Sequence, residues 1–158
     1  MSKYIFDTCV WIDLYGHYPR ETFEGLWENL DILLNDGSVV SSSEVLREIG
    51  KRDDLILAEV KKIAHLFRKP TIEEMSIAKE IVNKYQYIVK KKSINNGNPE
   101  ADAFVIAMAK KSNGIVVTTE ELKPNAQKIP NVCKDLNIEC LHFHDFFKKE
   151  NWKFKNSK

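Results

Sequence analysis

The sequence is poor in the features that mark membrane, disulfide-stabilised and fibrous proteins. Its 158 residues include only three cysteines, six glycines and five prolines. The longest uninterrupted apolar run covers residues 103–109, whereas a membrane-spanning helix needs about 20 apolar residues. The mixed segment that follows Met1 does not have the pattern of a signal peptide. These absences predict a protein without a membrane segment.

Other classes of protein lack their usual markers as well. The cysteines Cys9, Cys133 and Cys140 are too few and too scattered for a disulfide framework or a CxxC zinc site, and they fit a reduced, cytoplasmic setting. No GxGxxG segment follows a strand-like run, which disfavours a dinucleotide-binding fold. The net charge is +1, so bulk electrostatics neither demand nor exclude a nucleic-acid partner.

The overall composition and length are typical of one globular domain. Hydrophobic residues make up 43% of the chain and charged residues 30%, which excludes a disordered or collagen-like chain. A chain of this length can bury a hydrophobic core without help from disulfides or bound metals. We therefore expect a single domain over residues 1–158, with a basic and aromatic C-terminal tail from about residue 147.

Short apolar runs alternate with segments of helical periodicity along the chain. The runs that predict strands are 4–6, 38–41, 115–118 and about 138–143. The segments that predict helices are 23–34, 42–50, 57–67, 71–85, 98–112 and 131–136, with Ser42 or Ser43, Thr71 and Asn98 as N-terminal caps and Pro99 at a first helical position. This alternation predicts an α/β fold, a three-layer sandwich around a small parallel sheet.

Carboxylates stand where the predicted strands end or the following helices begin. They are Asp7, Glu44, Glu48, Asp102 and Glu120. The carboxyl ends of parallel strands meet at one edge of a sheet, so these groups are expected to converge there. Two unit charges about 4 Å apart repel by roughly 4 kcal/mol at an effective dielectric near 20. A divalent cation removes that conflict, and an oxygen-only donor set favours Mg²⁺ or Mn²⁺.

Four segments of this sequence resemble the PIN-domain ribonucleases. Residues 4–8 are similar to the opening strand and its first acid, and residues 45–49 to the segment that bears the second. Residues 100–109 are similar to the central acid and its small-residue helix, and residues 116–120 to a strand followed by Thr-x-acid. Residues 23–30 are also similar to a toxin-type, uncharacterised PIN-like subgroup. The last acid is usually Asp in this family, whereas here it is Glu120.

The resemblance implies Mg²⁺- or Mn²⁺-dependent cleavage of RNA, with a 5′-phosphate and a 3′-hydroxyl as products. It implies a catalytic and metal-binding set of Asp7, Glu48, Asp102 and Glu120, with Glu44 as an auxiliary metal ligand one turn before Glu48. It also implies an antitoxin partner and a possible homodimer. A catalytically weak PIN-like module that binds RNA or protein is the alternative.

Two interpretations are open for the threonines beside these acids and for the C-terminal tail. Thr8 and Thr118 either orient a carboxylate or satisfy their own backbone at a strand end. The tail, through Lys148, Lys149, Trp152 and Lys153, either binds single-stranded RNA or is a solvated helix end with Trp152 packed on the domain.

A phosphotransferase that uses Asp7 is a further possibility. That chemistry normally needs a second acid two residues on, where this chain has Cys9.

Overall fold

A five-stranded parallel sheet forms the centre of the protein, in a computed structural model that describes residues 3–88 and 100–155. The strand order is β3-β2-β1-β4-β5, and every neighbouring pair is parallel. The strands are β1 (Tyr4–Phe6), β2 (Val39–Ser42), β3 (Phe67–Arg68), β4 (Ile115–Thr118) and β5 (Cys140–His142). The three central strands, β2, β1 and β4, are buried along their whole length, as expected where helices cover both faces.

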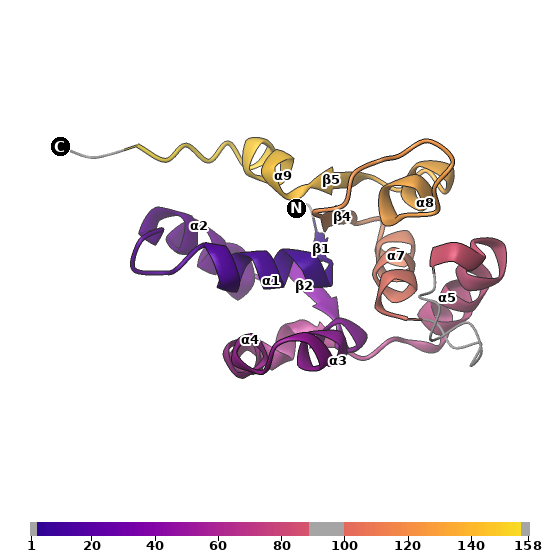
Figure 1. Ribbon diagram of the computed structural model, residues 1–158, viewed down its shortest axis with the longest axis horizontal. Helices are drawn as coiled ribbons and strands as arrows, with labels where there is room; N and C mark the ends of the chain where they lie inside the picture. Colours follow the sequence, from indigo (N-terminus) through magenta and orange to yellow (C-terminus); the bar gives the residue numbers. More distant parts are fainter. Residues whose placement is uncertain (1–2, 89–99, 156–158) are drawn as a thin grey trace.

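Helices cover the sheet on both sides. Figure 1 shows α1, α2 and α9 on one side and α5, α7 and α8 on the other, with α3 and α4 near β2. Helix α3 also contacts β3. This arrangement is the predicted three-layer α/β sandwich. The helices are α1 (Thr8–His17), α2 (Glu24–Asn35), α3 (Ser43–Arg52), α4 (Asp54–Val60), α5 (Ile72–Lys84), α7 (Ala101–Ser112), α8 (Ile129–Asp135) and α9 (Phe143–Lys149), with 3₁₀ turns η1 (Lys61–Leu66) and η2 (Gln86–Ile88).

Side-chain caps explain where several helices begin. The Ser42 hydroxyl accepts a hydrogen bond from the Glu44 backbone N–H and starts α3, as one of the two predicted caps. Thr71 and Glu74 form the predicted capping box of α5. Helix α7 begins at Ala101 after the extended Glu100, while Asn98 and Pro99 lie outside the described residues.

The predicted helix over residues 57–67 is wrong in two respects. Helix α4 begins at Asp54 and ends at Val60, where η1 follows with non-helical backbone angles at Ile63. Phe67 and Arg68 then form β3, which pairs with Ser41 and Ser42 of β2. Helix α1 is not among the predicted elements. It begins directly after β1, with Asp7 as its N-cap, and buries Val10, Trp11 and Leu14.

The C-terminal segment closes one side of the sandwich with aromatic side chains. Phe143 and Phe146 of α9 are fully buried, and Phe146 packs edge-on against Tyr4 of β1 with ring centroids 4.7 Å apart. The Tyr4 hydroxyl donates a hydrogen bond to the Glu150 carboxylate. Within the described ranges, no helix has the length and apolarity that a bilayer crossing needs.

Candidate metal-binding pocket

Four chain segments meet in one pocket at the carboxyl edge of the sheet. Asp7 follows β1, Glu120 follows β4, Glu48 lies on α3 and Asp102 lies in the first turn of α7. These four acids line a cavity of about 520 Å³, together with Thr8, Cys9 and Arg52. The topology therefore brings together the carboxylates that are spread over more than 110 residues of sequence, from position 7 to position 120.

Asp7 is the most constrained of the four acids. Its side chain is buried, and its Oδ1 accepts a hydrogen bond from the Thr8 backbone N–H at 2.7 Å. Its Oδ2 accepts hydrogen bonds from the Thr118 hydroxyl at 3.0 Å and from the Cys9 thiol at 3.1 Å. Burial raises the pKa of Asp7 to about 6, the nearby Glu120 charge adds to this rise, and the hydrogen bonds oppose it.

The Cys9 thiol has a structural role that its sequence position does not reveal. Its Sγ lies 3.5 Å from the Thr118 Oγ1 and accepts a hydrogen bond from the Thr119 backbone N–H at 3.3 Å. Burial raises the pKa of this thiol, and the Asp7 charge raises it further. A protonated Cys9 therefore acts as a hydrogen-bond donor that fixes Asp7.

The two threonines differ in what they contact. The Thr118 hydroxyl donates to Asp7 and accepts a hydrogen bond from the Glu120 backbone N–H at 3.2 Å, so it links two strand ends. Thr8 contacts Asp7 through its backbone, and its buried hydroxyl has no hydrogen-bond partner among the described residues. A buried hydroxyl without a partner costs about 1–3 kcal/mol, and Thr8 lines the same pocket.

Glu48 and Glu44 are separated by the structure although both lie on α3. Glu48 lines the pocket and pairs with Arg52, with 3.7 Å between the Arg52 Nη1 and the Glu48 Oε1. Glu44 pairs with Arg47 at 3.4 Å and is not among the residues that line the pocket. Arg52 was missed from sequence, although its position four residues after Glu48 predicts a contact on the same helix face.

Glu120 has a second contact besides its place in the pocket. Its Oε2 accepts a hydrogen bond from the Ile129 backbone N–H, at 3.1 Å, at the start of α8. The longer arm of this residue thus reaches away from β4 and ties the 119–128 loop to the next helix. An Asp at this position would be one methylene shorter.

The donor set of this pocket fits a hard divalent cation. The candidate ligands are carboxylate oxygens, and Thr8, whose buried hydroxyl has no hydrogen-bond partner among the described residues, lines the same cavity. The pKa of Asp7 is raised as expected for a buried carboxylate next to another acid. As the side chains stand, no group of three or more His, Cys, Asp or Glu in the described ranges has ligand geometry for a metal ion.

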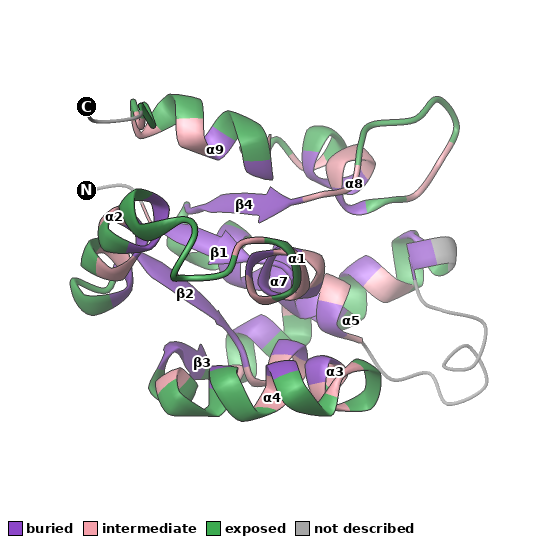
Figure 2. Ribbon diagram, turned by 60° about the vertical axis from the view of Figure 1, so that its left-hand side comes forward, coloured by how far each residue is buried: buried purple, intermediate pink, exposed green. Residues whose placement is uncertain are grey.

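The proposed RNA-binding residues of the tail lie elsewhere. Lys148, Lys149, Trp152 and Lys153 are not among the residues that line the acidic pocket. Lys149 pairs with Glu139 at 3.3 Å, just before β5 begins, and Trp152 stacks on Phe147 with ring centroids 5.7 Å apart. The tail is therefore at the amino edge of the sheet, and Figure 2 shows α9 running opposite to the direction of β4.

Comparison with known proteins supports the fold. The parallel sheet and the helices that cover it define an α/β fold similar to that of one chain of "VapBC2 from Rickettsia felis bound to a DNA fragment from their promoter". That chain superposes with a TM-score of 0.57 at 14% identity, over 89% of this chain and 98% of the other. A family model matches residues 4–154, so the chain belongs to the family described as "Domain of unknown function (DUF4411)". No curated protein matches the sequence significantly.

Proposed function

We propose that this protein is a metal-dependent endoribonuclease of the PIN-like kind. The observation that carries the proposal is the single pocket in which Asp7, Glu48, Asp102 and Glu120 meet at the carboxyl edge of a parallel sheet. The fold shared with a chain of the VapBC2 complex supports the same class. The four sequence segments that resemble PIN-domain ribonucleases contribute these four acids.

Asp7 and Asp102 are proposed to hold Mg²⁺ or Mn²⁺, with Glu48 and Glu120 completing the set. The bound cation would supply positive charge to the phosphodiester oxygens and lower the pKa of an attacking water. The hydrogen bonds from Cys9 and Thr118 hold one oxygen of Asp7 and leave its orientation fixed before the cation arrives. Glu44, which faces Arg47, is left out of the proposed set.

Arg52 is proposed to bind the RNA rather than the metal. Its guanidinium lies in the same pocket as the four acids and contacts Glu48 at 3.7 Å. A guanidinium donates paired hydrogen bonds to phosphate oxygens, so Arg52 can hold the phosphodiester against the carboxylate wall.

The biological setting follows from the same likeness. We propose a toxin of a toxin–antitoxin pair, acting on RNA in the reduced cytoplasm, with an antitoxin protein as partner and a homodimer as its assembly. The VapBC2 complex, which contains a chain of this fold and is bound to a DNA fragment from its promoter, is the observation that favours an antitoxin.

A cleavage assay tests this function directly. Purified protein is incubated with end-labelled single-stranded RNA and with Mg²⁺, Mn²⁺ or a chelator. The wild type should cut only when a divalent cation is present. Asp7→Asn and Asp102→Asn should each lose at least about 100-fold in rate, because a core ligand is removed. Lys110→Ala, which changes a charge at the other edge, is the matched control. Equal rates in the wild type and both carboxylate variants would rule the proposal out.

A catalytically weak module that binds RNA or protein is the second candidate. The contact between Glu120 and the Ile129 backbone favours it, because this acid is partly occupied in holding α8. Under this alternative the wild type binds RNA but does not cut it with either cation. Binding then persists in Asp7→Asn with unchanged affinity.

A further inference from the structure

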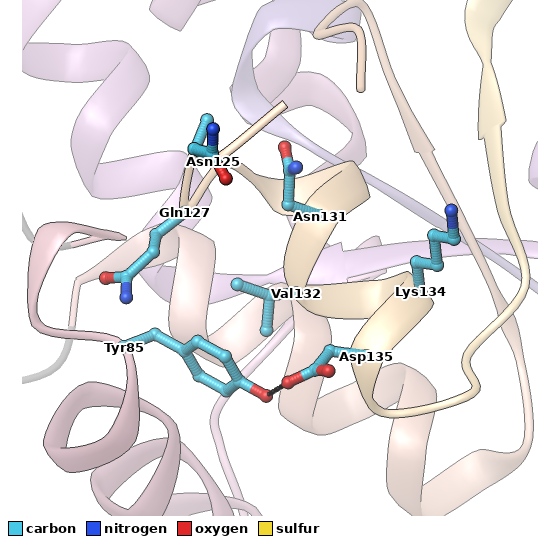
Figure 3. Close-up of a pocket in the computed structure, with 8 residues that line it drawn as sticks. Tyr85, Asn125, Gln127, Asn131, Val132, Lys134 and Asp135 are labelled. Atoms are coloured by element: carbon cyan, nitrogen blue, oxygen red, sulfur yellow. Dashed lines mark hydrogen bonds between the residues drawn. The ribbon is translucent and has the colours of Figure 1, made fainter. Parts of the chain in front are cut away.

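A second pocket lies behind the loop that carries Glu120. It has a volume of about 530 Å³, within the range of small-ligand sites. Figure 3 shows Asn125, Gln127 and Asn131 on one side, Tyr85 and Asp135 across from them, and Val132 between. Asn125 and Gln127 come from the loop between β4 and α8, and Asn131 from α8 itself.

The chemistry of this pocket suits a neutral ligand with both donors and acceptors. Three carboxamides line it, and each carries an N–H₂ donor and a C=O acceptor, although those of Asn131 bond to Lys123. The charge of Asp135 is offset, because its carboxylate accepts a hydrogen bond from the Tyr85 hydroxyl and pairs with Lys84 at 3.8 Å. Lys134 adds one positive charge to the lining, but carboxamides supply most of its polar groups, and these match the polar edge of a nucleobase.

The loop is anchored so that its amides are presented in a fixed place. The Asn131 Nδ2 donates to the Lys123 carbonyl at 2.6 Å, and its Oδ1 accepts from the Lys123 backbone N–H at 3.4 Å. Asn125 adopts a left-handed backbone conformation with φ of 59°, which asparagine tolerates better than most residues. Such anchoring lowers the entropy lost when a ligand binds.

The same loop connects the two pockets. Glu120 lines the acidic pocket and accepts a hydrogen bond from Ile129, and residues 125 and 127 between them line the second pocket. Single-stranded RNA is recognised mostly through unstacked bases, whose edges are read by side-chain hydrogen bonds.

We propose that the amide pocket, lined by Asn125, Gln127 and Asn131, binds one nucleobase of the RNA that is cleaved at the acidic pocket. This inference rests on the proposed function and specifies its substrate. Asn125 and Gln127 read the edge of the base, and Asn131 positions the loop. The protein then prefers one base at a fixed place relative to the cut.

Binding is measured without cleavage, in the full chain carrying Asp7→Asn and without divalent cations. The probes are fluorescein-labelled single-stranded RNA oligomers that differ only in base, read by fluorescence anisotropy. The parent should prefer one base by at least about fivefold, since each good base contact contributes about 1–3 kcal/mol of discrimination. Asn125→Ala with Gln127→Ala should reduce that preference to within about twofold and leave the affinity for the least preferred oligomer unchanged.

Two further variants keep the test decisive. Gln127→Glu keeps the shape of the side chain but removes its donor, so it should change which base is preferred, even if the double variant folds poorly. Asn35→Ala removes a carboxamide from the end of α2, outside the pocket lining, and should change nothing.

The outcomes separate this inference from the proposed nuclease. If the protein prefers one base but the wild type does not cleave RNA, the base-binding proposal is supported and the nuclease proposal is excluded. If the wild type cleaves RNA and all pocket variants keep the same base preference, the base-binding proposal is excluded and the nuclease proposal stands. Loss of affinity for all oligomers alike, or no RNA binding at all, would also overturn the base-binding role.

Discussion

The two edges of the sheet carry opposite charges and hold them in different ways. At the carboxyl edge, four acids line one cavity of about 520 Å³ with a single arginine, Arg52. At the amino edge, Lys3, Lys110 and Lys149 line a cavity of about 620 Å³ with a single acid, Glu139. Asp7 is 3% exposed, whereas the Lys149 side chain is 38% exposed.

This difference supports the proposal that the carboxyl edge carries the activity. A buried acid beside other acids costs stability, and such groups persist where a ligand or a reaction needs them. Solvated lysines cost little and keep a protein soluble. We therefore expect substitutions in the acidic pocket at the carboxyl edge to alter both stability and activity. Charge changes at the amino edge, called the basic edge below, should alter neither.

The largest effect is expected from Asp7→Asn in the absence of divalent cations. The pKa of Asp7 is raised to about 6 from 3.8, so the folded wild type binds a proton more tightly than the unfolded chain. Wild-type stability from this group is therefore present below about pH 4 and is lost as the pH rises through about 6. At neutral pH the variant should be more stable by about 2–3 kcal/mol.

Urea unfolding with a chelator, at about pH 4 and about pH 7.5, measures this difference. The two proteins should agree at the lower pH. A variant less stable than the wild type at the higher pH would show that the buried Asp7 carboxylate does not destabilise the fold. Glu44→Gln, on the same edge but outside the pocket, is the control.

A smaller effect, of about 1–3 kcal/mol, is expected from Gly114→Ala at the amino edge. A Cβ at this position would lie 2.5 Å from the Ile5 Cδ1 and 3.0 Å from the Lys3 carbonyl oxygen, so buried groups must move. The matched control is Gly16→Ala within α1, where no heavy atom lies within 4 Å and a gain of up to about 1 kcal/mol is expected. Thermal unfolding compares the two, and equal stabilities would contradict the tight packing of this edge.

The third effect separates two acids of one helix. Glu48→Gln should lower the rate of RNA cleavage by about tenfold or more, because Glu48 lines the acidic pocket. Glu44→Gln should stay within about twofold, since Glu44 pairs with Arg47 outside that pocket. Initial rates over a range of Mn²⁺ concentrations provide the measurement. The opposite ranking would place Glu44 in the site.

The smallest effect is expected from Lys110→Ala at the basic edge. Lys110 lies at the exposed end of α7, so stability should change by no more than about 0.5 kcal/mol. Its RNA cleavage rate should remain within about twofold of the wild type at moderate salt. A large loss of cleavage with unchanged folding would show that the basic edge takes part in the reaction.

Sequence reasoning predicted the features that depend on local pattern. The apolar runs of β1, β2 and β4 and the cap at Ser42 are encoded within a few residues, and so is the position of an acid after a strand. It missed β3, because two residues carry no periodicity and become a strand only by pairing with β2. It also placed no helix at α1, whose apolar stripe follows β1 without a break.

The details of the site depend on geometry that no local pattern contains. Glu44 and Glu48 lie one turn apart on α3, so spacing alone left both in the ligand set, and the structure places only Glu48 in the wall of the pocket. Sequence reasoning gave Cys9 no role in the site, whereas its thiol donates a hydrogen bond to the Asp7 carboxylate. That contact arises from the turn between β1 and α1, which sequence spacing does not specify.

The hydrogen bond between Tyr4 and Glu150 joins the first residue of β1 to the residue that caps α9, at the edge of the sheet opposite the acids. A label placed on Lys3 or Lys149, both at the amino edge, would therefore leave the acidic pocket at the opposite edge uncovered. Nucleic acid could then reach the pocket without meeting the label.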